Sequence, residues 1–262
     1  MISIREVPIV FFDTETEVSN DLPVEISACL AIGKEVKECF TTLVDIGTPI
    51  TAKSTMIHGI SDDMLREQRA PMLAVALRCF RMWLDSVGAI NVAAYNSPFD
   101  TRIIQGAVKR SAPDLGDFFK DRLVFDVLVL ARKLIKATDN ESLWAQPDHA
   151  PNRKLQTLRQ KFCPRLEGAA HRGEADVKST VHVFHALLDL YETKVGADLL
   201  DPHHVNTWLG IFEPLETFTF GKHNGKSVAA VWKMDPGYCN YMLGQKTIDP
   251  EIRAGLLKFK PR

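Results

Sequence analysis

Long apolar runs and paired cysteines are both missing from this chain of 262 residues. No stretch reaches the roughly 18 apolar residues that a membrane span requires, so we expect no membrane-spanning helix and no membrane partner. The five cysteines are scattered without a Cys-x-x-Cys pair, which indicates neither a zinc site nor a disulfide framework. The first residues also lack the layout of a signal peptide. These absences together predict a reducing, cytoplasmic compartment.

The chain also lacks an excess of charge of one sign, because 32 Lys and Arg residues nearly balance 33 Asp and Glu residues. The two signs are unevenly distributed. Residues 216–262 hold eight Lys and Arg against four Asp and Glu, whereas residues 1–215 hold 24 against 29. A near-neutral total is compatible with a nucleic-acid partner, but it requires any basic binding surface to be local.

Short apolar runs and amphipathic stretches predict an α/β fold. Strands are expected at 7–12, 24–32, 36–44, 89–95 and 123–125, with a hairpin turn at 33–34. A first helix is expected after Ser61, which would cap it, and a second at 71–87. Another starts at 98, and a further one follows the strand at 123–125 and continues through 134. The last two are expected near 153–163 and near 174–191. Strands that come first in a run and then alternate with helices are typical of a mixed sheet flanked by helices.

The distribution of these elements predicts two domains. Residues 1–199 hold all the expected strands of the sheet and would form the main domain. Residues 200–215 are interpreted as a linker, although 205–212 could pack on the main domain. The basic segment 216–262 would form a small C-terminal α+β module.

Four carboxylates and one histidine stand at the ends of these expected elements. Asp13 and Glu15 close the first strand, and their side chains point the same way because strand side chains alternate. Asp100 lies about one turn inside a helix that follows the fourth strand. Asp176 lies in the first turn of the last large helix, and His171 lies in the Gly-containing loop before it.

Carboxylates that converge repel one another unless cations compensate them, and oxygen-only ligands suit Mg²⁺ or Mn²⁺. We therefore predict two Mg²⁺ ions as cofactors, with Mn²⁺ able to substitute. Asp13, Glu15 and Asp176 would hold one ion, and Asp13 and Asp100 the other. His171 would take the proton of the attacking water. Two-metal carboxylate sites of this kind hydrolyse phosphodiester bonds.

The segments around these residues resemble the three motifs of the DEDDh (DnaQ-like) 3′–5′ exonucleases. They are Phe12-Asp13-Thr14-Glu15-Thr16, Asn96-Ser97-Pro98-Phe99-Asp100 and His171-x4-Asp176. Further segments are similar to the same family at His58-Gly59-Ile60, at 125–134 and at 155–158. The resemblance covers roughly residues 7–190 and departs from the family pattern at Tyr95, where the family often has His, and at 17–19.

The resemblance implies a ribonuclease H-like mixed β-sheet flanked by helices. It also implies release of nucleoside 5′-monophosphates from the 3′ end of DNA. Asp13, Glu15, Asp100 and Asp176 then correspond to the metal acids, and His171 to the general base. The residues that it assigns to substrate contact in this domain are Thr14, Thr16, His58, Asn96 and Phe99.

The C-terminal segment has a signature of its own, Phe220-Gly221-Lys222-His223-Asn224-Gly225-Lys226. It resembles the Phe-Gly-Lys-His-x-Gly-Lys module that follows the nuclease in exodeoxyribonuclease X-like proteins. Asn224-Gly225 predicts a tight turn that presents Lys222, His223 and Lys226 to substrate. Basic tips with nearby aromatic side chains can bind phosphates and stack bases, although a fold-completing role for the module is also open.

Three other functions stay open at this point. An RNA exonuclease of the same fold differs only in a few contacts near the terminal sugar. A nucleic-acid-binding scaffold on an inactive nuclease fold is disfavoured by the complete set of acids. A phosphodiesterase for small nucleotides is disfavoured by the basic C-terminal segment. DNA is the preferred partner, and both a monomer and a homodimer are compatible with the sequence.

Overall fold

The computed structural model describes residues 2–135, 153–164, 173–196, 201–210, 214–245, 248 and 250–261. Their contacts divide into two compact units. The first comprises the described parts of 1–136 and 153–206, and the second those of 207–262. Within the predicted linker, Pro202–Gly210 form a helix, α8. The assignment of a main domain, a linker and a C-terminal module stays a prediction.

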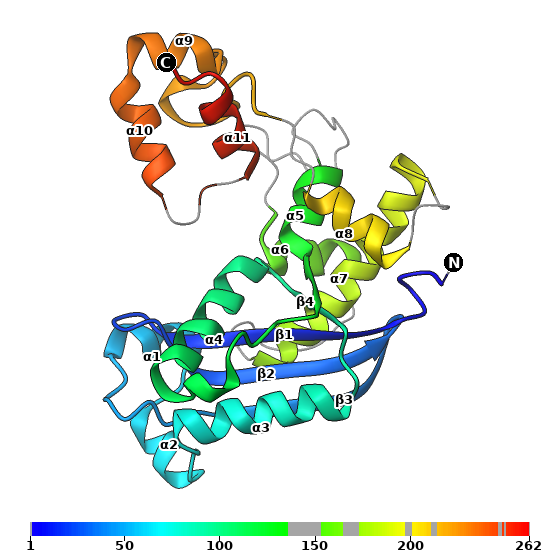
Figure 1. The fold of residues 1–262 in the computed structure, drawn as a ribbon, viewed down its shortest axis with the longest axis vertical. Coiled ribbons are helices and arrows are strands. Elements are labelled where there is room, and N and C mark those ends of the chain that lie inside the picture. Colours follow the sequence, from blue (N-terminus) through cyan, green and yellow to red (C-terminus); the bar gives the residue numbers. More distant parts are fainter. Residues whose placement is uncertain are drawn as a thin grey trace. The chain divides into compact units, whose positions relative to one another are not determined.

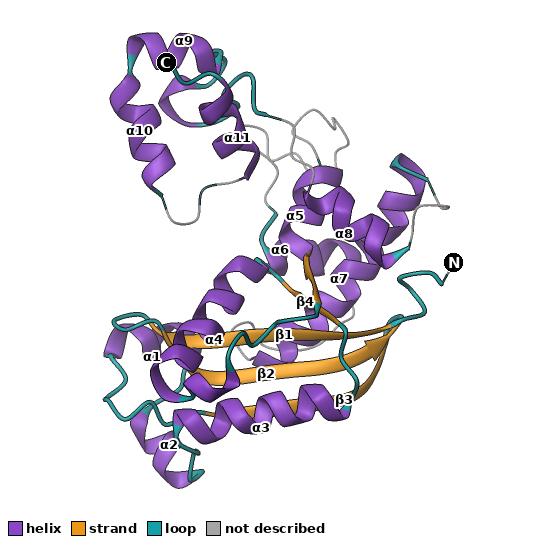
Figure 2. Ribbon diagram, in the orientation of Figure 1, coloured by secondary structure: helices purple, strands orange, loops and turns teal. Residues whose placement is uncertain are grey.

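The first unit contains a mixed sheet of five strands, as the sequence predicts (Figure 2). The strands are β1 (Pro8–Glu17), β2 (Leu22–Ile32), β3 (Glu35–Leu43), β4 (Asn91–Ala94) and β5 (Leu123–Asp126). Their order is β3-β2-β1-β4-β5, in which β1 pairs antiparallel with β2 and parallel with β4. β1 is therefore central, and most of its side chains are buried on both faces of the sheet.

Helices connect and cover the strands (Figure 1). In the first unit they are α1 (Ala52–His58), α2 (Asp62–Glu67), α3 (Leu73–Ser86), α4 (Ser97–Ser111), α5 (Val127–Leu134), α6 (Leu155–Phe162) and α7 (Gly173–Lys194), with a 3₁₀ turn η1 (Pro113–Leu115). The Ser61 side chain accepts from the Met64 N–H and caps α2, as expected. None of the described helices has the length and apolar character needed to cross a membrane.

The alternation of side chains on β1 sorts its residues between two helical layers. Phe12 contacts Phe80 of α3, with ring centroids 6.5 Å apart. Phe11 faces the opposite side and contacts Phe184 of α7 at 5.4 Å. Residues at odd positions of β1 therefore point toward the side of the sheet that α7 covers.

Cys29 and Cys39 correct the sequence-based expectation, because a disulfide joins them. The two cysteines stand directly opposite each other in the β2–β3 register. That register depends on the turn at Gly33 and on an irregularity in the pairing between Leu30 and Ala31, and cysteine spacing alone does not reveal it. Disulfides persist in oxidising surroundings, so this pair does not favour the expected reducing compartment, and the compartment stays a prediction.

The second unit has its own apolar core. Its helices are α9 (Val228–Met234), α10 (Pro236–Gly244) and α11 (Pro250–Lys258), preceded by a 3₁₀ turn η3 (Gly221–His223). The buried core residues are Phe218, Val228, Val231, Trp232, Cys239 and Leu256. Among its described residues, β structure is limited to an isolated antiparallel bridge between Thr217 and Ser227. This unit is therefore mainly helical.

Candidate active site

Asp13 and Glu15 lie in the second half of β1, on the face of the sheet that α7 covers. They alternate with Phe12 and Thr14, which point to the other face. Glu15 retains only 9% of its surface exposed, so its carboxylate is largely removed from water. Asp13 is half-buried. The strand therefore presents two neighbouring carboxylates to one region, as the sequence predicts.

Asp100 reaches the end of β1 from the first turn of α4. Its Oδ1 accepts hydrogen bonds from the Thr14 N–H at 2.9 Å and from the Thr14 hydroxyl at 2.7 Å. Asn96, the residue before α4, adopts the left-handed conformation with φ 71°, which turns the chain sharply from β4 into the helix. Asp100 is 2% exposed. The link to Thr14 therefore fixes a buried acid beside Asp13 and Glu15.

Asp176 approaches from the first turn of α7, where the helix dipole favours a negative group. It is buried, and its Oδ1 accepts a hydrogen bond from Gln156 Nε2 of α6 at 2.9 Å. α6 therefore holds the side chain of the last predicted metal acid. Gln156 was predicted only as part of a family-like helix, without a role of its own.

The pKa values show that these acids share one electrostatic environment. The pKa of Asp13 lies well above its ordinary value, first because of burial and then because of the charge on Asp100. Glu15 and Asp176 raise it further. Burial also raises the pKa of Glu15 to about 7, with Asp176 contributing next. Burial raises the pKa of Asp100 to about 7, although the hydrogen bonds from Thr14 act in the opposite direction.

Glu25 belongs to the same group and was missed by the sequence analysis. It stands opposite Glu15 in the β1–β2 register, and its charge raises the pKa of both Glu15 and Asp13. An acid inside the apolar run at 24–32 was the signal in the sequence. Its significance depends on strand register, since a shift by one residue would place it on the other face.

The donors that converge here are carboxylate oxygens, the class that Mg²⁺ and Mn²⁺ prefer. In the described part of the chain, no three His, Cys, Asp or Glu residues are arranged as a ready-made metal site. Asp100 and Asp176 each direct one oxygen to a protein donor, Thr14 and Gln156 respectively. The donor chemistry fits hard divalent cations.

His171 lies outside the described residues, which resume at Gly173. Its role as general base stays a prediction.

Comparison with known proteins identifies the family. A family model described as Exonuclease matches residues 10–184, which include β1, α4 and the start of α7. The chain belongs to this exonuclease family. The match spans all four predicted metal acids, so the acidic site lies within the family's own domain.

Relatives and solved structures agree with a nuclease domain. A DNA polymerase III subunit epsilon-like protein of Rhodobacter capsulatus is 36% identical over 140 residues, 51% of this chain and 18% of that protein. A PolC-type DNA polymerase III of Listeria welshimeri is 27% identical over 212 residues, 80% of this chain and 13% of that protein. The chain thus spans less than a fifth of the length of either relative.

Two solved structures show the ribonuclease H-like exonuclease fold. E. coli exonuclease I in complex with a dA13 oligonucleotide gives a TM-score of 0.55 at 18% identity, covering 81% of this chain and 47% of that chain. A 3′-exonuclease that recognises the histone mRNA stem-loop gives 0.50 at 16% identity, covering 71% and 64%. The mixed sheet flanked by helices is therefore confirmed.

In this exonuclease-family chain, three residues predicted to contact substrate surround the acids. Thr14 is buried against Asp100, and Thr16 is half-buried at the end of β1. Phe99 is half-buried in the first turn of α4, with the Arg102 guanidinium 5.4 Å from its ring centroid. These placements bring the three residues to the same end of the sheet as Asp13, and their contact with substrate stays a prediction.

Asn96 and His58 stabilise turns in the structure. The Asn96 N–H donates to Asp126 Oδ1 at 3.2 Å. His58 ends α1 and is 3% exposed, and its Nδ1 accepts from the Ile60 N–H at 3.0 Å. The Nε2 of this imidazole therefore carries the hydrogen in the neutral form. The observed role of His58 is to close the turn after α1.

The predicted basic tip is only partly exposed. Lys222 and Lys226 are exposed on the turn after Phe218, whereas His223 is 6% exposed. His223 Nε2 lies 3.0 Å from Asp235 Oδ2, and Lys222 Nζ lies 2.7 Å from the same oxygen. The prediction that the turn presents His223 to substrate is therefore wrong, because this side chain is buried. Its ring supports the turn that carries the two lysines.

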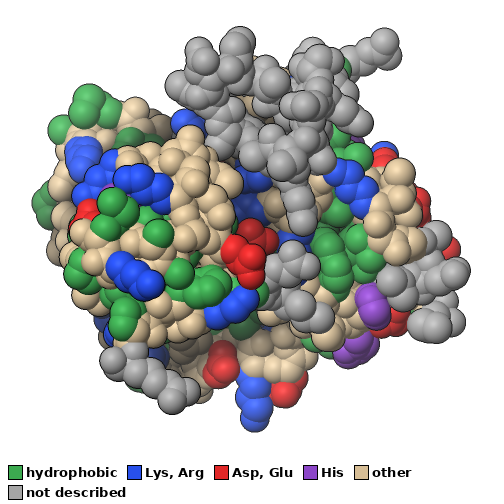
Figure 3. All heavy atoms as spheres, turned by 90° about the horizontal axis from the view of Figure 1, so that it is seen from above, with side chains coloured by type: hydrophobic (Ala, Val, Ile, Leu, Met, Phe, Trp, Pro, Cys, Tyr) green, Lys and Arg blue, Asp and Glu red, His purple; other side chains and the backbone are tan. Residues whose placement is uncertain are grey.

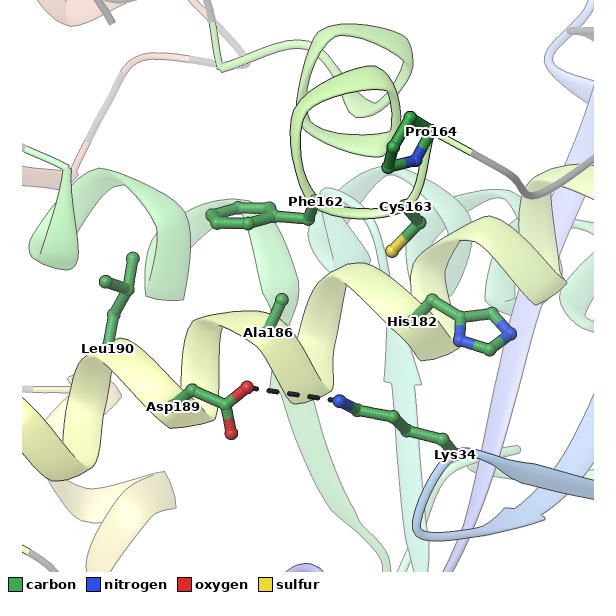
Figure 4. Close-up of a pocket in the computed structure, with 8 residues that line it drawn as sticks. All are labelled: Lys34, Phe162, Cys163, Pro164, His182, Ala186, Asp189 and Leu190. Atoms are coloured by element: carbon green, nitrogen blue, oxygen red, sulfur yellow. Dashed lines mark ion pairs between the residues drawn. The ribbon is translucent and has the colours of Figure 1, made fainter. Parts of the chain in front are cut away.

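An open pocket of about 710 Å³ lies elsewhere on the first unit, between α6, α7 and the β2–β3 turn. Figure 4 shows Lys34 and Asp189 pointing toward each other across it, at 3.9 Å, with His182 and Cys163 on its walls. None of the four predicted metal acids lines it.

Figure 3 shows Lys and Arg side chains in several separate groups on the face in view.

Proposed function

We propose that this protein is a metal-dependent 3′–5′ exonuclease that releases nucleoside 5′-monophosphates from DNA. The observation that carries the proposal is the convergence of Asp13, Glu15, Asp100 and Asp176 at one end of the sheet. The raised pKa values of Asp13, Glu15 and Asp100 reflect burial and repulsion between neighbouring acids, which bound divalent cations would relieve. The family supports a nuclease. The motif order supports the DEDDh type, and the C-terminal signature supports the exodeoxyribonuclease X-like group.

The acids divide between two cation sites in this proposal. Asp13, Glu15 and Asp176 would hold one divalent ion, and Asp13 with Asp100 would hold the second, with Mg²⁺ preferred and Mn²⁺ able to substitute. When bound, such ions activate the attacking water and neutralise charge at the scissile phosphate.

The protein's own groups then complete the hydrolysis. His171 accepts the proton of the water that attacks the terminal phosphorus in line. The bond from phosphorus to the 3′ oxygen of the preceding nucleotide breaks, and that oxygen takes up a proton. Thr14 holds Asp100 in place through its hydroxyl and backbone N–H throughout.

DNA is the proposed substrate because one relative named above is a DNA polymerase III subunit epsilon-like protein and the other is a PolC-type DNA polymerase III. RNA remains the second candidate. The fold is shared with a 3′-exonuclease that recognises an mRNA stem-loop, and no described contact distinguishes the two sugars. The C-terminal module, with Lys222 and Lys226 exposed, is proposed to contribute to holding the nucleic acid.

The test is digestion of 5′-labelled single-stranded DNA, duplex DNA and single-stranded RNA of one sequence, with Mg²⁺ and with EDTA. We expect a Mg²⁺-dependent ladder that shortens DNA from its 3′ end and is lost in Asp13→Ala. Glu174→Gln is the matched control, because Glu174 is an exposed acid in the first turn of α7 and pairs with Lys178. No cleavage of any polymer would favour a binding scaffold instead.

His171→Ala separates the general base from the metal acids. We expect this variant to fold and to bind Mn²⁺ like the wild type, but to hydrolyse DNA about 10²–10⁴-fold more slowly. Turnover is measured under single-turnover conditions with Mn²⁺ binding determined in parallel. A rate near that of the wild type would remove His171 from the mechanism.

A further inference from the structure

Glu25 is an acid that the proposed chemistry does not use. It lies on β2 directly opposite Glu15, and its charge adds to the repulsion on Asp13 and Glu15. A fifth carboxylate at this position opposes the ionisation of the acids that would bind cations. Some other contact must therefore account for its presence, and the start of α7 provides one.

The Glu25 carboxylate caps the first residue of α7. Its Oε2 accepts a hydrogen bond from the Gly173 N–H at 3.1 Å. The first N–H groups of a helix have no partner within the helix, and a carboxylate there also interacts favourably with the helix dipole. The cap comes from a strand far away in the sequence, so it fixes the helix to the sheet.

Gly173 allows this close approach because it has no side chain. A Cβ at this position would lie 2.3 Å from Ser27 Oγ and 2.6 Å from Glu25 Oε2. Ser27 Cβ would be 2.8 Å away, so rotating the hydroxyl alone would not make room. The start of α7 therefore lies directly on Glu25 and Ser27 of β2.

Asp176 lies three residues after Gly173, within the first turn of the same helix. Whatever fixes the Gly173 N–H therefore also fixes the backbone from which Asp176 extends toward Asp13 and Glu15. We infer that Glu25 is a positioning residue that fixes the first turn of α7 to β2 and so places Asp176 in the acidic site. The catalytic consequence of this contact rests on the nuclease function proposed above.

Glutamine at position 25 separates positioning from direct action. Glu25→Gln keeps a side-chain oxygen that can accept from the Gly173 N–H, but it removes the charge and most of the ability to bind a cation. Glu25→Ala removes both. A positioning residue is rescued by glutamine, whereas a metal ligand or an acid that transfers a proton is not.

The experiment compares the full-length wild type, Glu25→Gln, Glu25→Ala, Gly173→Ala and the control Glu174→Gln. Gly173→Ala should also displace the first turn of α7, because the added methyl group would push α7 away from β2. Every carboxylate remains in this variant. Three quantities are measured: hydrogen exchange of the backbone at the start of α7, Mn²⁺ affinity without substrate, and kcat and KM on single-stranded DNA. Circular dichroism verifies that each variant is folded.

We expect Glu25→Ala and Gly173→Ala to exchange faster at the start of α7. They should bind Mn²⁺ about 10–100-fold more weakly and lose kcat by a similar factor, with KM within about threefold of the wild type. Glu25→Gln and Glu174→Gln should stay close to the wild type in all three measurements.

Two results would overturn the inference. Equal losses in Glu25→Gln and Glu25→Ala would show that the Glu25 charge acts directly at the site. Unchanged exchange and Mn²⁺ affinity in Glu25→Ala would show that the cap does not position α7. A wild type that degrades no polymer would refute the nuclease function, while the exchange measurement would still decide the role of Glu25.

Discussion

Asp13 shows at the scale of a single residue how a functional site opposes stability. Its pKa is raised well above its ordinary value by burial and by neighbouring acids, first Asp100. A carboxyl group whose pKa is higher in the folded state than in the unfolded state binds its proton more tightly when folded. This tighter proton binding stabilises the folded state fully at pH values below the unfolded-state pKa. The stabilisation is lost as the pH rises through the folded-state pKa. The site is therefore least stable in its charged form without cations.

Asp13→Asn should reverse this effect. In EDTA at about pH 8, we expect its free energy of unfolding to exceed that of the wild type by about 1–2 kcal/mol, because a buried repulsion is removed. The difference should shrink as the pH falls, because the raised pKa lets the wild-type acid take up a proton. Mg²⁺ should raise the melting temperature of the wild type but not of the variant.

Urea unfolding in EDTA measures the first effect, and thermal unfolding with and without Mg²⁺ measures the second, with Glu174→Gln as the exposed-acid control. A folded Asp13→Asn that is less stable than the wild type in EDTA at about pH 8 would contradict the repulsion described here.

At the scale of elements, patterns that depend on neighbouring residues predicted the structure well. The apolar run at 7–12 predicted the start of β1, which continues to Glu17, and the turn at Gly33 separates β2 from β3 as expected. The amphipathic stretch at 71–87 predicted α3 to within two residues at its start. Asp13 and Glu15 on one strand face followed from alternation alone. These features need only a strand or helix period, which the local sequence carries.

Features that depend on register or on packing between distant elements could not be predicted. Glu25 joins the acids only because β2 pairs with β1 so that Glu25 faces Glu15. Gln156 reaches Asp176 only because α6 packs on α7. The helix α8 lies in the stretch that was interpreted as a linker. Tertiary contacts decide each of these positions, and the local sequence does not specify such contacts.

The pair formed by Cys29 and Cys39 makes the β2–β3 hairpin testable as an element. We expect reduction, or Cys39→Ser, to lower the free energy of unfolding by about 1–3 kcal/mol, because the cross-link restricts the unfolded chain. Cys79→Ser is the control, since Cys79 is an exposed free thiol. Alkylation and mass spectrometry of the unreduced protein identify the pair. Alkylation of both Cys29 and Cys39 before reduction would show that the bond does not form.

The whole molecule combines two units with different charge. Each has its own buried core, so neither depends on the other for an apolar interior. Residues 216–262 carry twice as many basic as acidic residues, while the rest of the chain is acidic. An acidic first unit repels a polyanion from its acidic site. A basic second unit that contacts phosphates would compensate for this repulsion.

Lys226 tests this division of roles, because it is exposed and its neighbour His223 is buried. Lys226→Ala should weaken binding of single-stranded DNA in EDTA and lower the slope of log Kd against log salt by about 0.7, as expected for one lost phosphate contact. Lys120→Ala, an exposed lysine of the first unit, controls for the loss of charge.

His223→Ala should instead lower the melting temperature, since Asp235 loses a buried partner, and should change the salt slope little. Fluorescence anisotropy at several salt concentrations measures the slopes. Equal slopes for the wild type and Lys226→Ala would show that this turn does not touch phosphates, and the module would then serve the fold or a protein partner rather than the nucleic acid.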